Sequence, residues 1–436
     1  MKQTVALLTW VILHAAVSYA AIEHPELMVP HAAQPPKLDG RLDDACWQIP
    51  PPITEFRRVD VARRLPTQRT EAWITCDEDA LYIAAKCYED RMEQVQSVET
   101  GVDGSVWKDD CLEVFLMPGQ PFYYHLAANL LGTRYDARHD TQAPPQSQEP
   151  GQWDGDWAVA SHRGKGYWNM EIAIPFACLE LGTRRLAEPF RFNIGREQRR
   201  LTEFSCWPAA GFHKFDEFAV LKDLRLDSER YGLSLGDIVM GEGVPGPNRF
   251  AARVAEEPVA NATADIRVRV RRLPHGVAQV HGGRYSSSLG GELALDYSIT
   301  LTGGWVEVVV EALDNQQRTR ASLCDVFRVP SAVEAALNLP LLYVSDGCVR
   351  LSGRVAISAA LLPKVKLRGA VISGGKRGRE LSIPVVKDSG AFSASIPIAN
   401  LKPGSHLLET RLTAAGLTAE PVVNGFTFRV IVGPME

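Results

Sequence analysis

Several signals are missing from this sequence of 436 residues, and each absence excludes a class of protein. The chain has no GxSxG, no HExxH and no phosphate-binding glycine loop, so the commonest hydrolase, zinc-protease and nucleotide-binding motifs are absent. No strand–helix alternation of the kind that builds an α/β barrel is present. The formal charge is −5 and charges of one sign do not form long runs, which argues against a nucleic-acid partner.

Long apolar runs are also scarce. The only one lies at the N-terminus. Lys2 precedes an apolar run from Val5 to Val17, and the small residues Ser18 and Ala20 follow it. This pattern predicts a signal peptide over residues 1–20, and therefore a secreted or periplasmic protein. The run is too short to cross a bilayer and no second run follows, so no membrane span is predicted. No cysteine stands at the cleavage site, which argues against a lipoprotein.

Eight cysteines are present, but none forms a CxxC pair or a metal-finger spacing. In an exported chain they are compatible with one or two disulfides. Several fall within strand patterns, where a free buried thiol explains them equally well. The sequence does not predict any required cofactor.

Short alternating segments separated by Pro and Gly run through the whole chain and predict an all-β protein. The spacing favours one large β-sandwich followed by two smaller immunoglobulin-like β-sandwiches. We expect domains over residues 30–227, 258–335 and 338–434, with a linker over residues 228–257. A helical turn that begins at Asp43 or Asp44 is expected to bury Trp47. Four arginines at 267, 269, 271 and 272 alternate with apolar residues and are expected on the solvated face of a strand.

The segment WKDDCLEVFLM, residues 107–117, carries the clearest functional signal. Alternation along this strand puts Glu113 on the face opposite Leu112, Val114 and Leu116. An exposed Trp107 beside an acid suits a neutral, polyhydroxylated ligand, because the indole stacks on C–H groups and the carboxylate accepts hydroxyl hydrogen bonds. The alternative is a core tryptophan followed by two turn aspartates.

Residues from about 30 to 227 resemble a family 9 carbohydrate-binding module, a β-sandwich of the wider DOMON-like group. The likeness extends in order and spacing across the domain. It is carried by Leu38–Gly40, Asp43, Asp44, Trp47, Leu81–Ile83, Asp90, Trp107–Asp110, Glu113, Gly132–Asp136, Trp153–Trp157, Trp168, Glu171–Phe176, Arg191–Arg196 and Ser205–Pro208.

The resemblance implies a sugar held between the faces of Trp107 and Trp207. It also implies polar contacts to the sugar from Glu113, Arg134 and Asp136, the last standing where family members often have an amide. A strand-edge salt bridge is the alternative role for Arg134, and a buried plug is the alternative for Trp207.

The family also binds structural calcium, and Asp39, Asp90 and Asp109 are candidate oxygen ligands. Aspartates in turns serve the turn itself more often, which is the alternative interpretation.

Three functions follow from these observations. The first is a non-catalytic carbohydrate-binding protein that supports polysaccharide breakdown, with the C-terminal domains as spacers or as docking sites for a partner enzyme. The second is a glycoside hydrolase, an enzyme acting on O-glycosyl bonds, that would use Glu113 and Asp136 as its two carboxylates. The third is a haem-binding redox protein, for which Met117, His125, His162 and Met170 are the available axial ligands.

Overall fold

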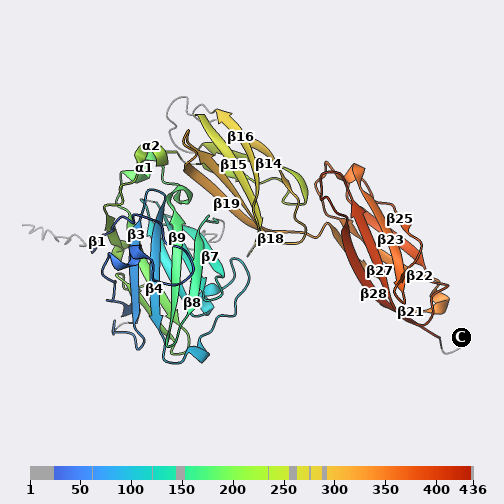
Figure 1. Ribbon diagram of the computed structural model, residues 1–436, viewed down its shortest axis with the longest axis horizontal. Helices are drawn as coiled ribbons and strands as arrows, with labels where there is room; N and C mark the ends of the chain where they lie inside the picture. The colour runs from blue at the N-terminus through green and yellow to red at the C-terminus, as the bar shows by residue number, and fades with distance from the viewer. Residues whose placement is uncertain are drawn as a thin grey trace, which may run out of the picture.

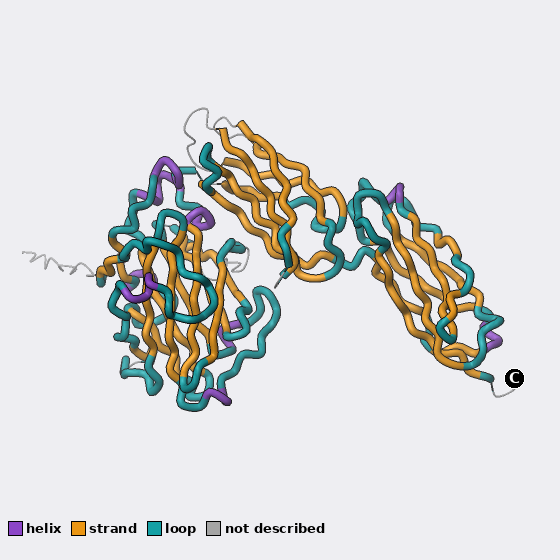
Figure 2. The backbone as a smooth tube through the Cα atoms, viewed as in Figure 1, coloured by secondary structure: helices purple, strands orange, loops and turns teal. Residues whose placement is uncertain are grey.

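The described residues form three β-sandwiches that follow one another along the chain (Figures 1 and 2). The computed structural model describes residues 24–60, 62–119, 121–143, 153–233, 235–254, 263–273, 276–286 and 292–433. The predicted all-β fold class is confirmed, while the predicted signal peptide lies outside the described residues. In the described part of the chain, no helix combines the length and the hydrophobicity that a membrane crossing needs.

The first sandwich packs a larger sheet against a smaller one. The larger sheet has the order β1-β12-β10-β5-β6-β7, with β11 beside β10 and β2 beside β11. Its strands are β1 (Glu26–Met28), β2 (Arg57–Arg58), β5 (Cys111–Met117), β6 (Phe122–Asn129), β7 (Arg134–Asp140), β10 (Arg191–Gln198), β11 (Glu203–Trp207) and β12 (Ala219–Lys222). The smaller sheet has the order β3-β4-β9-β8, with strands β3 (Thr70–Cys76), β4 (Ala80–Tyr88), β8 (Ala158–Arg163) and β9 (Tyr167–Pro175).

Short helical turns connect these strands. They are η1 (Ala45–Gln48), η2 (Met92–Gln94), η3 (Val106–Lys108), η5 (Phe176–Leu179), α1 (Gly182–Leu186), η6 (Phe215–Glu217) and α2 (Ser228–Tyr231). As predicted, η1 buries Trp47, which is 3% exposed. The Trp47 Nε1 atom donates to Glu171 Oε1 at 2.8 Å, so the turn is held on β9 by a buried charge-assisted hydrogen bond.

The core of the first sandwich follows from strand alternation. Leu112, Val114 and Leu116 of β5 point between the two sheets and are at most 1% exposed. Ile83 of β4 and Ile172 of β9 meet them from the smaller sheet. Because the side-chain period of a strand is two, the intervening residues of β5 must lie on the outer face of the larger sheet.

The second sandwich pairs the sheet β13-β14-β17 with the sheet β16-β15-β18-β19. Its strands are β13 (Leu235–Val239), β14 (Gly246–Val254), β15 (Thr263–Arg272), β16 (Gln279–Ser286), β17 (Glu292–Ile299), β18 (Gly304–Leu313) and β19 (Thr319–Val329). The predicted linker over residues 228–257 is therefore wrong for its described part, which forms α2, β13 and β14. Leu235 and Phe250 of this segment pack into the core of the second sandwich, an alternation that the intervening Gly-rich turn obscures.

The third sandwich begins earlier than expected, because β20 already pairs with β22. Its sheets have the orders β20-β22-β26 and β21-β28-β27-β23-β24, with β25 beside β23. The elements are β20 (Val333–Leu337), β21 (Leu341–Tyr343), η7 (Val344–Asp346), β22 (Cys348–Val355), η8 (Leu362–Lys364), β23 (Lys366–Ser373), β24 (Lys376–Arg377), β25 (Leu381–Ile383), β26 (Ala391–Pro397), β27 (Gly404–Thr413) and β28 (Val422–Ile431).

All eight cysteines lie within the described residues as free thiols. Every one except Cys348 is buried. The sequence was compatible with disulfides or with free buried thiols, and the structure has free thiols.

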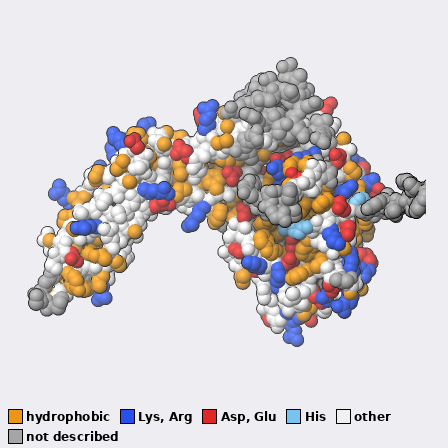
Figure 3. Space-filling model, turned by 180° about the vertical axis from the view of Figure 1, so that it is seen from behind, with side chains coloured by type: hydrophobic (Ala, Val, Ile, Leu, Met, Phe, Trp, Pro, Cys, Tyr) orange, Lys and Arg blue, Asp and Glu red, His pale blue; other side chains and the backbone are white. Residues whose placement is uncertain are grey.

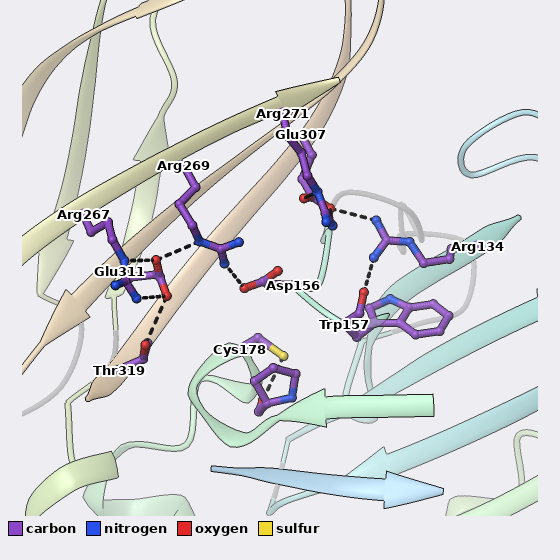
Figure 4. A network of polar contacts seen from close by, with 11 residues as sticks. Arg134, Asp156, Trp157, Cys178, Arg267, Arg269, Arg271, Glu307, Glu311 and Thr319 are labelled. Carbon is purple, nitrogen blue, oxygen red and sulfur yellow. Dashed lines mark hydrogen bonds and ion pairs between the residues drawn. The ribbon is translucent and has the colours of Figure 1, made fainter. Parts of the chain in front are cut away.

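A network of ion pairs joins the first two sandwiches (Figure 4). The Arg269 guanidinium pairs with Asp156 of the first sandwich and donates to Glu311 at 2.9 Å. Arg271 pairs with Glu307, which is 1% exposed. The expectation that these arginines of β15 face solvent is therefore wrong for Arg269 and Arg271, which pair with acids at the junction, while Arg272 is exposed as expected.

Candidate functional site: the outer face of the larger sheet

The outer face of the larger sheet is built from alternate residues of β5, β6 and β7. Residues directly opposite each other in antiparallel strands share a face, and Glu113 lies opposite Ala127, which lies opposite Tyr135. By the same pairing, Phe115 lies opposite His125. The face thus collects one acid and several rings, and the side chains of η3 and of residues 208–218 lie against it.

Trp107 stands at one end of this face, where η3 leads into β5. Its ring meets that of Tyr135 edge-on, with the centroids 4.8 Å apart and the planes at 78°. The indole is partly exposed and packs against the buried cluster of Val106, Cys111, Ala127, Tyr135 and Ala137. Trp107 is therefore neither a plug in the main core nor a free surface side chain.

Trp207 lies on the opposite face of the sheet. In β11 it is paired with Ile194, whose side chain belongs to the core between the sheets. The Trp207 ring is 6.5 Å from that of Phe192, and it packs against the same core. The structure therefore does not bring Trp107 and Trp207 together as two faces of one clamp.

Arg134 and Asp136 also lie on the other side of the sheet from Glu113. They are paired with Ala128 and Leu126, which point into the core, so alternation directs both polar side chains inward. Arg134 Nη2 donates to Glu307 Oε1 at 2.9 Å, and its Nη1 donates to the Trp157 carbonyl.

The Asp136 carboxylate accepts hydrogen bonds from the Trp157 indole and, at 3.2 Å, from the Gly155 amide. Asp136 therefore lies beside Arg134 near the junction between the sandwiches, which corrects the expectation that both face a sugar beside Trp107. The alternative of a salt bridge holds for Arg134, with Glu307 as its partner in place of Glu113 or Asp136.

Glu113 lies on the outer face as expected, but it is only 2% exposed. Its Oε2 atom is 2.6 Å from His125 Nε2. Burial raises the pKa of Glu113 to about 7, and burial together with the Glu113 charge raises the pKa of Glu197 to about 9. The two carboxyl groups therefore hold at least one proton between them at neutral pH.

Three histidines gather next to Glu113 and were not grouped by the sequence analysis. They are His125 of β6, His139 of β7 and His213 of the segment before β12, and each offers a ring nitrogen within 4.8 Å of the others. Tyr123 contacts two of them: its ring stacks on His139 at 4.8 Å, and its hydroxyl lies 3.0 Å from His213 Nδ1. Strand alternation could have grouped His125 with His139, but only tertiary folding brings in His213.

The three aspartates predicted as calcium ligands are each engaged separately. Asp39 pairs with Lys37 at 2.9 Å, and Asp90 pairs with Arg200. Asp109 is 1% exposed and accepts from the amides of Val98 and Glu99 and from Asn129. The calcium site stays a prediction that these contacts do not favour.

The residues behind the two alternative functions are also dispersed. Glu113 and Asp136 lie on opposite faces of the sheet, so they do not face each other across a cleft as a pair of glycosidase carboxylates would. Of the candidate haem ligands, Met170 lies in the core between the sheets and His162 lies on β8 of the other sheet, whereas Met117 and His125 share the outer face of the larger sheet.

A second concave surface lies on the outer face of the smaller sheet. This open pocket of about 520 Å³ is lined by Trp47, Trp73, Glu71, Lys86 and Tyr167, among other residues. It combines aromatic rings with charged groups, as a sugar-binding surface does.

The first domain is thus a two-sheet β-sandwich with aromatic rings and the buried Glu113 on one outer face. The recognition of this domain from its sequence is confirmed, because the model of the family described as "Carbohydrate family 9 binding domain-like" matches residues 38–196. The match supports a carbohydrate-binding role for this part of the chain. No curated protein matches the sequence.

Solved structures resemble the chain more distantly. A family 9 carbohydrate-binding module from Caldicellulosiruptor kristjanssonii in complex with glucose is 12% identical, with a TM-score of 0.32 over 45% of this chain and 94% of that one. A family 9 carbohydrate-binding module from the same organism in complex with cellotriose is 13% identical, with a TM-score of 0.31 over 47% of this chain and 96% of that one. A protein from Bacteroides uniformis is 19% identical, with a TM-score of 0.35 over 46% of this chain and 99% of that one. At these scores only the family match bears on function.

Proposed function

We propose that this protein is an exported, non-catalytic carbohydrate-binding protein whose first sandwich binds sugar on the outer face of the larger sheet, at Trp107. The family match over residues 38–196 is the observation that carries the proposal. Trp107 supports this location, because its partly exposed indole is fixed edge-on against Tyr135 and needs no ordering before a sugar ring stacks on it. The second and third sandwiches would act as spacers or dock a partner enzyme of polysaccharide breakdown.

The proposal differs from a two-tryptophan clamp in what it expects of Trp207. Since Trp207 packs against the core on the opposite face, a sugar at Trp107 does not need it. Glu113 would orient the ligand through His125 rather than by direct contact, because the carboxylate is buried beneath that ring.

Calorimetric titration of the full chain with a panel of mono- and oligosaccharides tests this arrangement. We expect Trp107→Ala to weaken binding on the order of tenfold, in line with the loss of one stacking contact. Trp207→Ala and the matched control Trp305→Ala, which removes a partly exposed indole from the second sandwich, should leave the affinity unchanged.

Each other outcome has a definite meaning. Loss of binding in both Trp107→Ala and Trp207→Ala, with the fold intact, would restore the clamp. Loss in Trp73→Ala alone would move the site to the pocket on the smaller sheet. Absence of heat with every sugar would contradict carbohydrate binding for the panel.

A further inference from the structure

The three histidines on the outer face come from separate segments and converge. Their ring centroids are 6.1 Å apart for His125 and His139, 5.1 Å for His125 and His213, and 5.4 Å for His139 and His213. Imidazole groups gain little from being placed together in the absence of a shared ligand, because each loses hydration when buried. Figure 3 shows histidine atoms at the surface of the first sandwich, next to hydrophobic side chains.

Two of the rings are held by a second residue in the manner of metal ligands. A metal-binding histidine commonly uses its other ring nitrogen for a carboxylate or another polar group, which fixes its orientation. His125 Nε2 is hydrogen-bonded to Glu113 Oε2 at 2.6 Å, and His213 Nδ1 is hydrogen-bonded to the Tyr123 hydroxyl at 3.0 Å. Their remaining nitrogens, Nδ1 of His125 and Nε2 of His213, are the ones that an ion would take.

His213 is exposed at the surface of the cluster, which gives an ion a path from solvent.

We propose that His125, His139 and His213 form a binding site for one divalent transition-metal ion of the kind that prefers imidazole, such as Zn²⁺ or Cu²⁺. Zn–N bonds of about 2.0 Å in a tetrahedral site place ligand nitrogens about 3.3 Å apart. The ligand nitrogens now lie within 4.8 Å of one another, so rotations of the three side chains that bring the rings closer together would complete the site. Three protein ligands leave one position open for water or for an oxygen of a bound ligand.

The site borders the surface proposed for sugar, because the ring centroids of His125 and Tyr135 are 5.3 Å apart. The metal proposal does not depend on sugar binding, however, since it uses neither Trp107 nor the family match. Its competitor on the same face is the group of Cys111, Glu113 and Glu197. Complete burial raises the pKa of Cys111 well above its ordinary value, so that sulfur remains a thiol and is a poor ligand.

The test is to strip the full chain with a chelator and to titrate it with Zn²⁺, and with Co²⁺ as a visible probe. We expect one ion per chain and ligand-field absorption from Co²⁺ bound to nitrogen. His213→Ala and His139→Ala should each weaken binding by tenfold or more. His162→Ala, a histidine of the same domain on the smaller sheet, and Cys111→Ser should bind as the wild type does.

His213 is exposed, so its removal should not disturb the fold, and circular dichroism of each variant verifies this. The proposal is overturned if the wild type holds no ion at micromolar concentration. It is equally overturned if binding survives in both histidine variants, or if Cys111→Ser alone abolishes it. Sugar titration of the stripped protein keeps the two proposals apart, because failure of one leaves the other measurable.

Discussion

Glu307 is an acid with almost no contact with water, and two arginines hold it in its charged form. Arg134 of the first sandwich and Arg271 of β15 both pair with its carboxylate, and burial alone would favour the protonated form. Hydrogen bonding to Arg271 and the charges of both arginines hold the pKa of Glu307 below its ordinary value all the same. One residue thus ties a strand of the second sandwich to a strand of the first.

Glu307→Gln should destabilise the first two sandwiches on the order of 3 kcal/mol, because it leaves buried guanidinium groups without their counter-charge. The matched control is Glu26→Gln, which breaks an exposed pair with Lys222 in the first sandwich and should cost less than about 1 kcal/mol. Urea unfolding followed by tryptophan fluorescence measures both. Equal effects of the two variants would contradict a buried, energetically important junction.

Asp154 makes the same junction dependent on pH. Its carboxylate accepts from the Val326 amide of β19 at 2.9 Å, and burial next to Asp136 and Asp103 raises its pKa to about 8. The folded protein therefore binds a proton that the unfolded chain, with an ordinary pKa near 4, has already released. The resulting stability is present at low pH and is lost as pH rises towards about 8.

We expect the wild type to lose stability between pH 6.5 and 8.5, by at most about 1.4 kcal/mol per pH unit from this group. Asp154→Asn should show a smaller decline in thermal unfolding temperature over the same interval. An identical decline in both proteins would assign the pH dependence to other groups.

The turn at Asp39-Gly40 packs the N-terminal segment against the strands of the smaller sheet. Gly40 has φ +77°, and a Cβ there would lie 2.3 Å from the backbone carbon of Ser161 in β8. Its amide also donates to Glu171 at 2.7 Å. Gly132 has the nearly identical φ of +76° but open space around it.

Gly132→Ala should therefore cost only the left-handed backbone strain, about 1 kcal/mol. Gly40→Ala adds a clash with backbone that cannot move aside, and should cost about 3 kcal/mol in total. The two unfolding midpoints in urea give the comparison. Similar losses would mean that the turn is free to lift from β8.

The strands could largely be predicted from the sequence, because alternation is a local property. The strand predicted within residues 107–117 is present as β5 (Cys111–Met117), and Glu113 lies on the face opposite Leu112, Val114 and Leu116, as the alternation indicates. The site was harder to predict, because a motif does not state on which face a residue lies. Arg134 and Asp136 flank Tyr135 in β7, yet only the Tyr135 side chain faces outward. His213 depends on a contact across the fold, with Tyr123 ninety residues earlier, which no local pattern encodes.

At the scale of the molecule the two junctions differ in kind. The first and second sandwiches share buried ion pairs, whereas the third extends away from the second in Figure 1. There the hydrogen bonds run from the Ser358 amide to the Pro245 carbonyl at 2.8 Å and from the Ala359 amide to Glu242 at 3.1 Å. Two hydrogen bonds, one of them between the buried residues Pro245 and Ser358, contribute less coupling energy than the buried ion pairs of the first junction, so we expect the first two sandwiches to unfold as one unit and the third as another.

Tryptophan provides the means to separate these units, because every tryptophan beyond the predicted signal peptide lies between residues 47 and 305 and none lies in the third sandwich. Leu408→Ala, at a fully buried position of β27, should destabilise the third sandwich by about 2–5 kcal/mol. Far-ultraviolet circular dichroism should then show an earlier transition while the tryptophan fluorescence transition stays in place. Glu307→Gln should shift the fluorescence transition and leave the third sandwich unchanged. If Leu408→Ala moves both signals together, the three sandwiches form one cooperative unit, and the weak second junction is stronger than its hydrogen bonds imply.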